Sequence, residues 1–292
     1  MTLPHDPLWP RAHSLFSSHE SAYLDAILVG IPAHQTSISS TNAHQTPQAI
    51  RESLQRYSLA HSNPAVMMEK LKVWDAGNLT NPDSNEAKTI EEVRQYSINS
   101  KMLLALGGDN SITYSVAMGM GAQGLITFDA HYDLRDGSSN GSPVRRLIES
   151  GLSGRRIVQI GIAEFSNSPA YAARAREYGI TVIHRSELRN SSCEDIWKRA
   201  LDVAGDHLHV DFDIDVCDRS VVPACPAAAP GGISADEIRQ FAFLAGASPQ
   251  VRSIDITEID SSQDAPDQRT VRLGALVVLE TLAGLTTRRV TP

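Results

Sequence analysis

The sequence predicts an α/β fold: one three-layer domain with a mostly parallel central sheet flanked by helices. From Lys101 onward, short apolar runs alternate with segments that carry helix-start signals. The runs are apolar throughout, which is typical of strands whose two faces are both covered. Acidic clusters follow two of these runs, at the carboxyl ends of strands, where ligands bind in such sheets. These observations predict a buried parallel sheet with a polar site at one edge.

The first predicted strand is the apolar run Asp25–Pro32, closed by Gly and Pro. A polar segment rich in Ser, Thr and His follows over 33–45, and we interpret it as a functional loop. A helix is expected from Pro47 to about Arg56. We expect a single domain over 1–292, with residues 1–24 as an N-terminal tail and 25–285 as the catalytic core.

Six further strands and several helices are expected along the rest of the chain. Ser168 followed by Pro169 is typical of a helix start, and Pro143 starts another helix. The patterns Ser234-x-x-Glu237 and Thr89-x-x-Glu92 each predict a capping box. The predicted strands are Met102–Leu106, Leu125–Phe128, Ile157–Ile162, Ile180–Ile183, Leu208–Ile214 and Ser253–Ile259.

The composition excludes several classes of protein. The 292 residues include 26 basic and 34 acidic side chains, a net charge of −8, with no long Lys/Arg cluster to follow a phosphate backbone. Nucleic acid is therefore not an expected partner. No apolar run reaches 18 residues, and no membrane association is expected. Three cysteines form neither a disulfide framework nor a zinc spacing, which favours the cytoplasm.

Two acidic clusters carry the expected chemistry. Asp129, His131 and Asp133 alternate directly after one predicted strand, so their side chains leave the chain on one side. Asp211, Asp213 and Asp215 alternate at the end of another, with Asp218 three residues on. A single Asp-x-Asp is more often a capped edge or a solvated turn than a ligand pair. Two such clusters on one sheet, one of them containing an imidazole, favour a metal site.

Buried carboxylates at this density need compensating positive charge. An oxygen-rich ligand set with one imidazole suits Mn²⁺ better than a metal that prefers thiolates. Two ions about 3.5–4 Å apart, sharing Asp129 and Asp213, would activate a water for attack at neutral pH. The sequence therefore predicts a hydrolase with a dinuclear metal centre.

The motifs resemble those of the ureohydrolase family, which comprises arginases, agmatinases and formimidoylglutamases, from about Ala26 to Ala283. The family's sequence Gly-Gly-Asp-His-Ser appears as Gly107-Gly-Asp-Asn-Ser111, and Asp-Ala-His-x-Asp as Asp129–Asp133. Asp-x-Asp-x-x-Asp with its Pro-Gly-Gly turn appears as Asp213–Asp218 and Pro230–Gly232. The resemblance implies an arginase/deacetylase-like fold and a homo-oligomer, either a trimer or a hexamer.

Within the family, the chain is most similar to formimidoylglutamases that have Asn in the first motif. The similar segments are Gly107–Tyr114, Asn140–Leu147, Glu164–Ser168 and Ala224–Ala227. The resemblance implies hydrolysis of N-formimidoyl-L-glutamate to L-glutamate and formamide, a step of histidine breakdown. An agmatinase or guanidino-acid ureohydrolase is the alternative.

The resemblance also implies roles for individual residues. A hydroxide held by the metals and oriented by Asp133 would attack the amidine carbon, while Glu258 would hold the substrate nitrogen. The metal ligands would be Asn110, Asp129, His131, Asp133, Asp213 and Asp215. Arginases have a His just before a Gly in the loop after the Asp-x-His-x-Asp motif, where this chain has Asn140-Gly141. Another group or water must therefore supply the proton to the leaving amine.

The substrate carboxylates require a cation, and Arg135 is the first candidate. Asn140 and Asn167 are further expected substrate contacts. Arg145 and Arg146 are weaker candidates, because the helix start at Pro143 favours surface positions for them. Similar sequences have an Arg where this chain has Ala163, which bears on the choice of substrate.

Asn110 replaces the imidazole expected at one metal position. A neutral amide is a weaker ligand, so we expect one tightly bound Mn²⁺ and a second that is bound more weakly near Asn110. Loss of the second ion would leave a site resembling that of single-metal deacetylases, which act on amides. A relative without catalytic activity is the remaining alternative.

Overall fold

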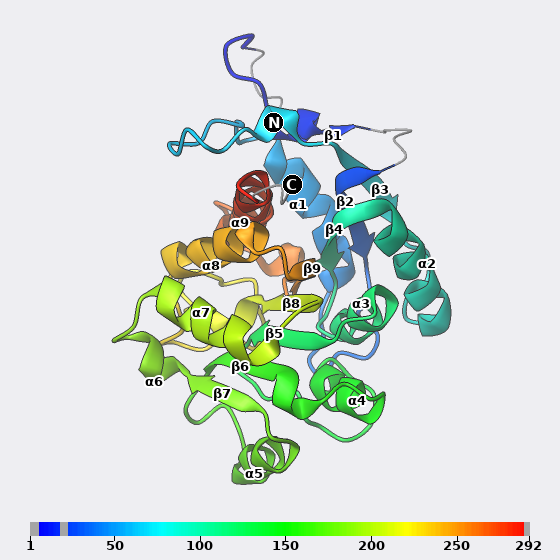
Figure 1. Ribbon diagram of the computed structural model, residues 1–292, viewed down its shortest axis with the longest axis vertical. Coiled ribbons are helices and arrows are strands. Elements are labelled where there is room, and N and C mark those ends of the chain that lie inside the picture. Colours follow the sequence, from blue (N-terminus) through cyan, green and yellow to red (C-terminus); the bar gives the residue numbers. More distant parts are fainter. Residues whose placement is uncertain (1–5, 18–22, 289–292) are drawn as a thin grey trace.

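The computed structural model describes residues 6–17 and 23–288. Its strands form one nine-stranded sheet in the order β1-β3-β2-β4-β9-β8-β5-β6-β7, and all eight pairings are parallel (Figure 1). The strands are β1 (Phe16–Ser17), β2 (Leu24–Ile31), β3 (Val73–Asn78), β4 (Ser100–Gly107), β5 (Gly124–Phe128), β6 (Ile157–Ile162), β7 (Thr181–His184), β8 (Leu208–Asp213) and β9 (Val251–Thr257). The predicted α/β class and parallel sheet are confirmed.

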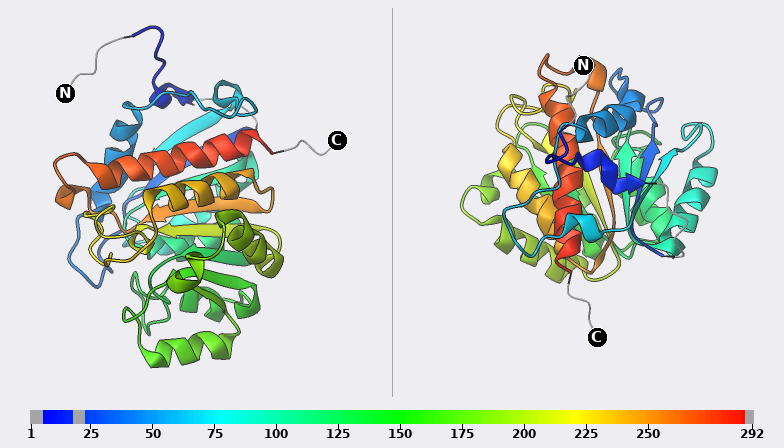
Figure 2. Two further views of the ribbon diagram at one scale, coloured as in Figure 1. Left: turned by 90° about the vertical axis from the view of Figure 1, so that its left-hand side faces the viewer. Right: turned by 90° about the horizontal axis from the view of Figure 1, so that it is seen from above.

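Helices cover both faces of this sheet. In Figure 1, α7, α8 and α9 lie on the left of the sheet and α2, α3 and α4 on the right. Figure 2 shows α8 and α9 side by side along one face. The helices are α1 (Thr46–Leu54), α2 (Glu86–Asn99), α3 (Ile112–Met120), α4 (Pro143–Glu149), α5 (Pro169–Tyr178), α6 (Arg185–Leu188), α7 (Cys193–Ala204), α8 (Ala235–Ala247) and α9 (Arg269–Thr286).

The largest core cluster fills the space between the sheet and the α7–α9 layer. Phe128 of β5 stacks on Phe212 of β8, with ring centroids 4.9 Å apart, and contacts Phe241 of α8 at 4.6 Å. All three rings are almost completely buried, and Phe128 and Phe212 directly precede Asp129 and Asp213 in the sequence. Aromatic packing therefore fixes the strand ends from which the acidic clusters project.

The helix starts differ from the sequence prediction at one place. Ser168 caps α5, and Ser234 with Glu237 forms the predicted capping box of α8. Thr89 is not a cap, since it lies buried inside α2, whose N-cap is Asn85. The Asn85 side chain accepts a hydrogen bond from the backbone of Lys88, so the helix starts four residues earlier than a cap at Thr89 predicts.

Part of the segment expected to be a tail is ordered against the sheet. Residues 12–15 form a short 3-10 helix with Ala12 and Leu15 buried, and β1 pairs with β3. Within residues 6–17 and 23–288, no helix is both long enough and apolar enough to cross a membrane.

Candidate metal centre

Four neighbouring strands deliver the candidate residues to one edge of the sheet. In the order β4, β9, β8, β5, all parallel, Asn110 follows β4, Glu258 directly follows β9, Asp213 ends β8, and Asp129 directly follows β5. Parallel strands bring their carboxyl ends to the same edge, so residues far apart in the sequence meet there.

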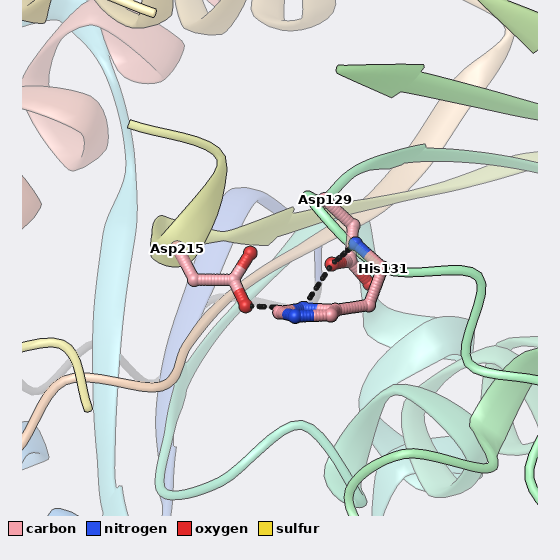
Figure 3. A group of neighbouring side chains, drawn as sticks. All are labelled: Asp129, His131 and Asp215. Carbon is pink, nitrogen blue, oxygen red and sulfur yellow. Dashed lines mark hydrogen bonds and ion pairs between the residues drawn. The ribbon is translucent and has the colours of Figure 1, made fainter. Parts of the chain in front are cut away.

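Asp129, His131 and Asp215 form the most compact part of the site (Figure 3). The Nδ1 atom of His131 lies 2.7 Å from Oδ2 of Asp215 and 3.5 Å from Oδ1 of Asp129. One potential ligand atom from each residue lies within 4.8 Å of the others. The second oxygen of Asp129, Oδ2, is buried without a hydrogen-bond partner. A buried carboxylate oxygen in this position is costly unless a cation binds it.

Backbone amides hold these carboxylates in place. The His131 amide donates to Oδ1 of Asp129 at 2.6 Å, and the Ala130 amide donates to Oδ1 of Asp215 at 3.0 Å. The Asp215 amide in turn donates to Oδ1 of Asp213 at 2.9 Å. The carboxylates are therefore oriented before any ligand arrives.

The charges of the site are unbalanced without a cation. Burial and the charge of Asp215 raise the pKa of Asp129 to about 7. Burial and the same neighbour raise the pKa of Asp213 well above its ordinary value. Burial alone would lower the pKa of His131, but the Asp215 charge and the hydrogen bonds that the imidazole donates to both carboxylates raise it to about 12. The imidazolium in turn holds the pKa of Asp215 down, against the effect of burial.

These residues fit a divalent cation. The imidazolium partly replaces a metal as the positive partner of Asp129 and Asp215, while Asp213 has no such compensation. A hard ion such as Mn²⁺ would balance all three carboxylates and occupy the free oxygen of Asp129. The outer acids of the second cluster do not line the site: Asp211 lies buried beside Asp255, and Asp218 accepts the Gly231 amide.

Asn110 and Asp133 form a second, adjacent part of the site. Nδ2 of Asn110 donates to Oδ2 of Asp133 at 2.7 Å, while its Oδ1 accepts from the hydroxyls of Thr113 at 2.6 Å and Thr257 at 3.1 Å. The carboxamide nitrogen therefore faces the acidic cluster, and the oxygen faces away from it. Burial and the charge of Asp129 raise the pKa of Asp133 well above its ordinary value.

Glu258 contacts the backbone of Asn110, whereas Asp133 contacts its side chain. Its Oε1 accepts from the Asn110 amide at 2.8 Å and from Nδ2 of Asn140 at 2.9 Å. Burial, followed by the charge of Asp109, raises its pKa to about 7. Glu258 and Asp133 both have left-handed backbone conformations, with φ of 64° and 52°. Such strain in non-glycine residues clusters at functional sites, where the fold fixes it for a purpose.

The polar loop 33–45 reaches this site, as its interpretation as a functional loop requires. The Ile38 amide donates to Oδ1 of Asn140 at 3.0 Å, and Ser37 donates to Oδ2 of Asp109 at 2.6 Å. Asn140 thus links the loop to Glu258. Sequence reasoning missed Ile38, because no local pattern distinguishes it from its neighbours.

A cavity of about 260 Å³ opens above the acidic cluster. Arg135 is exposed at this cavity and supplies the only guanidinium among the described residues that line it. The other lining residues are Ile38, Ser39, His131, Tyr132, Asp133, Leu134, Asn140, Gly141, Ser166, Asn167, Ser168, Tyr171, Asp213, Asp215, Pro226, Ala227 and Glu258.

The side-chain amide of Asn167 forms hydrogen bonds with the protein backbone. Its Oδ1 accepts from the Tyr132 backbone at 3.1 Å, and its Nδ2 donates to the carbonyls of Ala130 at 2.8 Å and Ala163 at 3.4 Å. The residue lines the cavity, but these bonds fix the segment that carries His131 and Asp133. Its position favours a supporting role over the expected contact with substrate.

The two candidate arginines of α4 do not line this cavity. The surface position expected for Arg145 is wrong, because the residue is buried and its Nε donates to the Arg135 carbonyl at 2.6 Å. Arg146 pairs with Glu86, with Nη1 and Oε1 2.8 Å apart. Arg145 therefore stabilises the loop that presents Arg135.

Comparison with known proteins gives consistent matches over most of the chain. The arginase family matches residues 24–284. Formimidoylglutamase of Bacillus subtilis strain 168 is 33% identical over 276 residues, covering 88% of this chain and 86% of the relative. Guanidinopropionase of Pseudomonas aeruginosa is 30% identical over 284 residues, covering 90% of this chain and 87% of that protein.

Solved structures show the same fold. The crystal structure of the Bacillus subtilis formimidoylglutamase superposes with a TM-score of 0.89 at 29% identity, covering 98% of this chain and 95% of the other. Trypanosoma cruzi formiminoglutamase, solved with two Mn²⁺, gives a TM-score of 0.89 at 26% identity and covers 96% of this chain and 100% of the other.

Proposed function

The chain belongs to the arginase family of hydrolases, which act on C–N bonds of linear amidines, and on that premise we propose that it hydrolyses N-formimidoyl-L-glutamate to L-glutamate and formamide. The resemblance inferred from the motifs is thereby confirmed at the level of the family. One observation supports the specific substrate most directly: the cavity has an acidic floor, Glu258 at its side and Arg135 at its mouth. An amidine at one end and a carboxylate at the other match this distribution of charge.

We assign the metal positions from the residues that meet at the strand ends. Asp129, His131, Asp213 and Asp215 would hold the first Mn²⁺. Asp133, with Asn110 and the shared carboxylates of Asp129 and Asp213, would hold a second, weaker one. When bound, the two ions supply an acidified water as nucleophile and stabilise the negative charge that develops during its attack.

The protein's own groups complete the reaction. Asp133, a carboxylate beside the metal position, accepts the proton of the attacking water and holds it for the departing amine. Glu258 accepts hydrogen bonds from the amidine N–H groups, and Asn140 keeps its Oε1 in place. Arg135 binds a carboxylate of the glutamate part.

A second candidate substrate class has a specific observation in its favour. Formimidoylglutamate carries two carboxylates, but the described lining offers one guanidinium, and the chain has Ala163 where similar sequences have Arg. A guanidino acid with one carboxylate needs no second cation. A guanidino-acid hydrolase is therefore the alternative.

The decisive experiment compares substrates under the same Mn²⁺ loading. Purified protein is incubated with formimidoylglutamate, guanidinopropionate, guanidinobutyrate, arginine and agmatine, and formamide or urea release is measured. Preference for formimidoylglutamate supports the proposal, and preference for a guanidino acid replaces it with the alternative. Without turnover of any of these substrates, an acylated amine is tested next, as a single-metal deacetylase requires. Failure there also would leave the protein without its proposed activity.

A further inference from the structure

A buried polar network lies beneath Asn110, on the side away from the cavity. The Thr113 hydroxyl lies 2.6 Å from Oδ1 of Asn110 and 3.0 Å from Oδ2 of Asp255. The same Asp255 oxygen lies 3.2 Å from Nε2 of His209, whose Nδ1 lies 2.9 Å from the Ser253 hydroxyl. Thr113, Asp255, His209 and Ser253 are completely buried. None of these groups has a part in the reaction described above.

The Thr113 hydroxyl cannot donate a hydrogen bond to both of its neighbours at once. A hydroxyl has one proton, and Thr113 faces two acceptors, the Asn110 oxygen and the Asp255 carboxylate. When Asp255 is ionised and Thr113 donates to Asn110, the Thr113 oxygen faces the Asp255 oxygen at 3.0 Å with no proton between them. His209 does not relieve this contact, because its Nε2 lies 3.2 Å from the same Asp255 oxygen, and a proton on that nitrogen points to Asp255 and away from the Thr113 oxygen. The arrangement therefore contains one unfavourable contact in a fully buried place.

Turning the Asn110 carboxamide by half a turn about its Cβ–Cγ bond removes that contact. Nδ2 then donates to the hydroxyls of Thr113 and Thr257, and Thr113 is free to donate to Asp255. Oδ1 now faces Oδ2 of Asp133, where Nδ2 donates at 2.7 Å in the present arrangement. Two oxygens facing each other are unfavourable unless a proton or a cation lies between them, and a cation can bind both while Asp133 stays ionised. Each orientation thus has one unfavourable contact, and a bound metal removes only that of the second.

We infer that Thr113 and Asp255 are positioning residues that stabilise Asn110 with its carboxamide oxygen toward the second metal position. This inference rests on the role proposed for Asn110 at that position. Without metal, the nitrogen of Asn110 donates to Asp133; with metal, the oxygen becomes a ligand and the nitrogen donates to Thr113 and Thr257. His209 supports this arrangement, because its contact with Asp255 keeps that carboxylate within hydrogen-bond distance of Thr113.

The test removes one hydroxyl and measures Mn²⁺ binding directly. Thr113→Val leaves a buried N–H of Asn110 facing a methyl group in the ligand orientation, whereas in the other orientation Oδ1 still accepts from Thr257. Thr113→Ser keeps the hydroxyl. Thr281→Val makes the same chemical change at a fully buried position in α9 whose hydroxyl has no hydrogen-bond partner among the described residues, and it serves as the control. Both Mn²⁺ affinities are measured by electron paramagnetic resonance titration, with Mn²⁺ as the only ligand.

We expect Thr113→Val to weaken the second Mn²⁺ by about tenfold and to leave the first unchanged, as is usual for groups behind a ligand. Thr113→Ser and Thr281→Val should stay within about twofold of the unaltered protein. Asp255→Asn, which weakens the acceptor for Thr113, should also selectively weaken the second ion, and it provides the test if Thr113→Val does not fold.

Equal Mn²⁺ affinities in Thr113→Val and the unaltered protein would overturn the inference, as would equal weakening of both ions. An unaltered protein that binds a single Mn²⁺ would overturn it too. Because substrate is absent, failure to hydrolyse formimidoylglutamate would count against the proposed function and leave this result intact.

Discussion

Glu258 receives hydrogen bonds from two distant segments, the backbone of Asn110 and the side chain of Asn140. Both bonds favour the ionised carboxylate, and they oppose the rise in its pKa caused by burial and by Asp109. The loop 33–45 takes part through Ile38, which holds the other end of the Asn140 amide. The position of the Glu258 carboxylate therefore depends on three segments, those that contain Asn110, Asn140 and Ile38.

Replacing this acid tests its proposed contact with the amidine. Glu258→Gln keeps the shape and removes the charge, so we expect kcat/KM to fall by roughly 100-fold, the equivalent of about 3 kcal/mol for a lost charge-assisted hydrogen bond. Steady-state kinetics on the Mn²⁺-loaded protein give the value. Glu177→Gln, an exposed substitution in α5, is the control and should leave kcat/KM unchanged. Full activity of Glu258→Gln would remove Glu258 from the mechanism.

Arg135 should affect binding of the substrate more than the chemical step. Arg135→Met keeps most of the length and removes the cation, and we expect KM for formimidoylglutamate to rise by about 10- to 100-fold with kcat nearly constant. Arg155→Met changes an exposed arginine outside the cavity and should leave both constants as they are. A fall in kcat at constant KM would instead place the guanidinium at the reacting group.

At the scale of elements, the strands with continuous apolar runs were predictable, while the two-residue strand β1 and the longer β3 were not. The reason is clearest for β3. Its sequence, from Val73 to Asn78, mixes two polar and two small residues with Val73 and Trp74, and most of its residues are only partly buried. It lies near one end of the sheet, where a strand does not need a fully apolar sequence. Sheet position, which local sequence does not encode, decided this case.

The candidate site likewise has a part that local sequence predicts and a part that it does not. Alternation after a buried strand predicted that Asp129, His131 and Asp133 would lie together, because strand geometry fixes that relation locally. The bonds from Asn140 to Glu258 and from Thr113 to Asn110 could not be foreseen, since they depend on side-chain orientation at the site. The burial of Arg145 was missed because a helix start alone does not show which face meets a loop.

The contact between α8 and α9 depends on two glycines, Gly246 of α8 and Gly284 of α9. A Cβ at Gly284 would lie 2.1 Å from the Phe243 carbonyl oxygen, which is backbone and cannot move aside. Despite a gain of about 1 kcal/mol in helix propensity, we expect Gly284→Ala to destabilise the protein by about 1–2 kcal/mol and to lower Tm by about 5 °C. Calorimetry of the Mn²⁺-loaded protein measures this change.

The matched control lies in the same helix. A Cβ at Gly274 would meet the ends of the Ile50 and Ile259 side chains at 3.0 and 3.2 Å, and these can give way. Gly274→Ala should therefore keep Tm within about 2 °C. If the two variants behave alike, close backbone packing is not what requires glycine at 284.

At the scale of the whole molecule, the metal centre makes stability depend on pH. Asp129 would ionise near its ordinary value of 3.8 when unfolded, but its pKa is about 7 in the fold. A carboxyl with a raised pKa favours the folded state at low pH, and that contribution is lost as pH rises through the folded value. The raised pKa values of Asp133, Asp213 and His131 act in the same direction.

We therefore expect protein stripped of metal with a chelator to have a lower Tm at pH 8 than at pH 6. Added Mn²⁺ should raise Tm at both values and more at pH 8, because the ion replaces the missing protons. Differential scanning calorimetry at the two pH values, with and without Mn²⁺, measures both effects. A metal-free protein that is more stable at pH 8 would contradict the ionisation behaviour described for this cluster.

The position of β9 in the sheet has a consequence for biosynthesis. Of the strands in residues 6–17 and 23–288, β9 comes last in the sequence, yet it lies between β4 and β8 and pairs with both. A growing chain can form β2 with β3 and β4, and separately β5 with β6 and β8, but the two groups remain unjoined until residues 251–257 leave the ribosome. Asn110 follows a strand of the first group and Asp213 ends a strand of the second, so metal loading of the complete centre must follow the synthesis of residues 251–257.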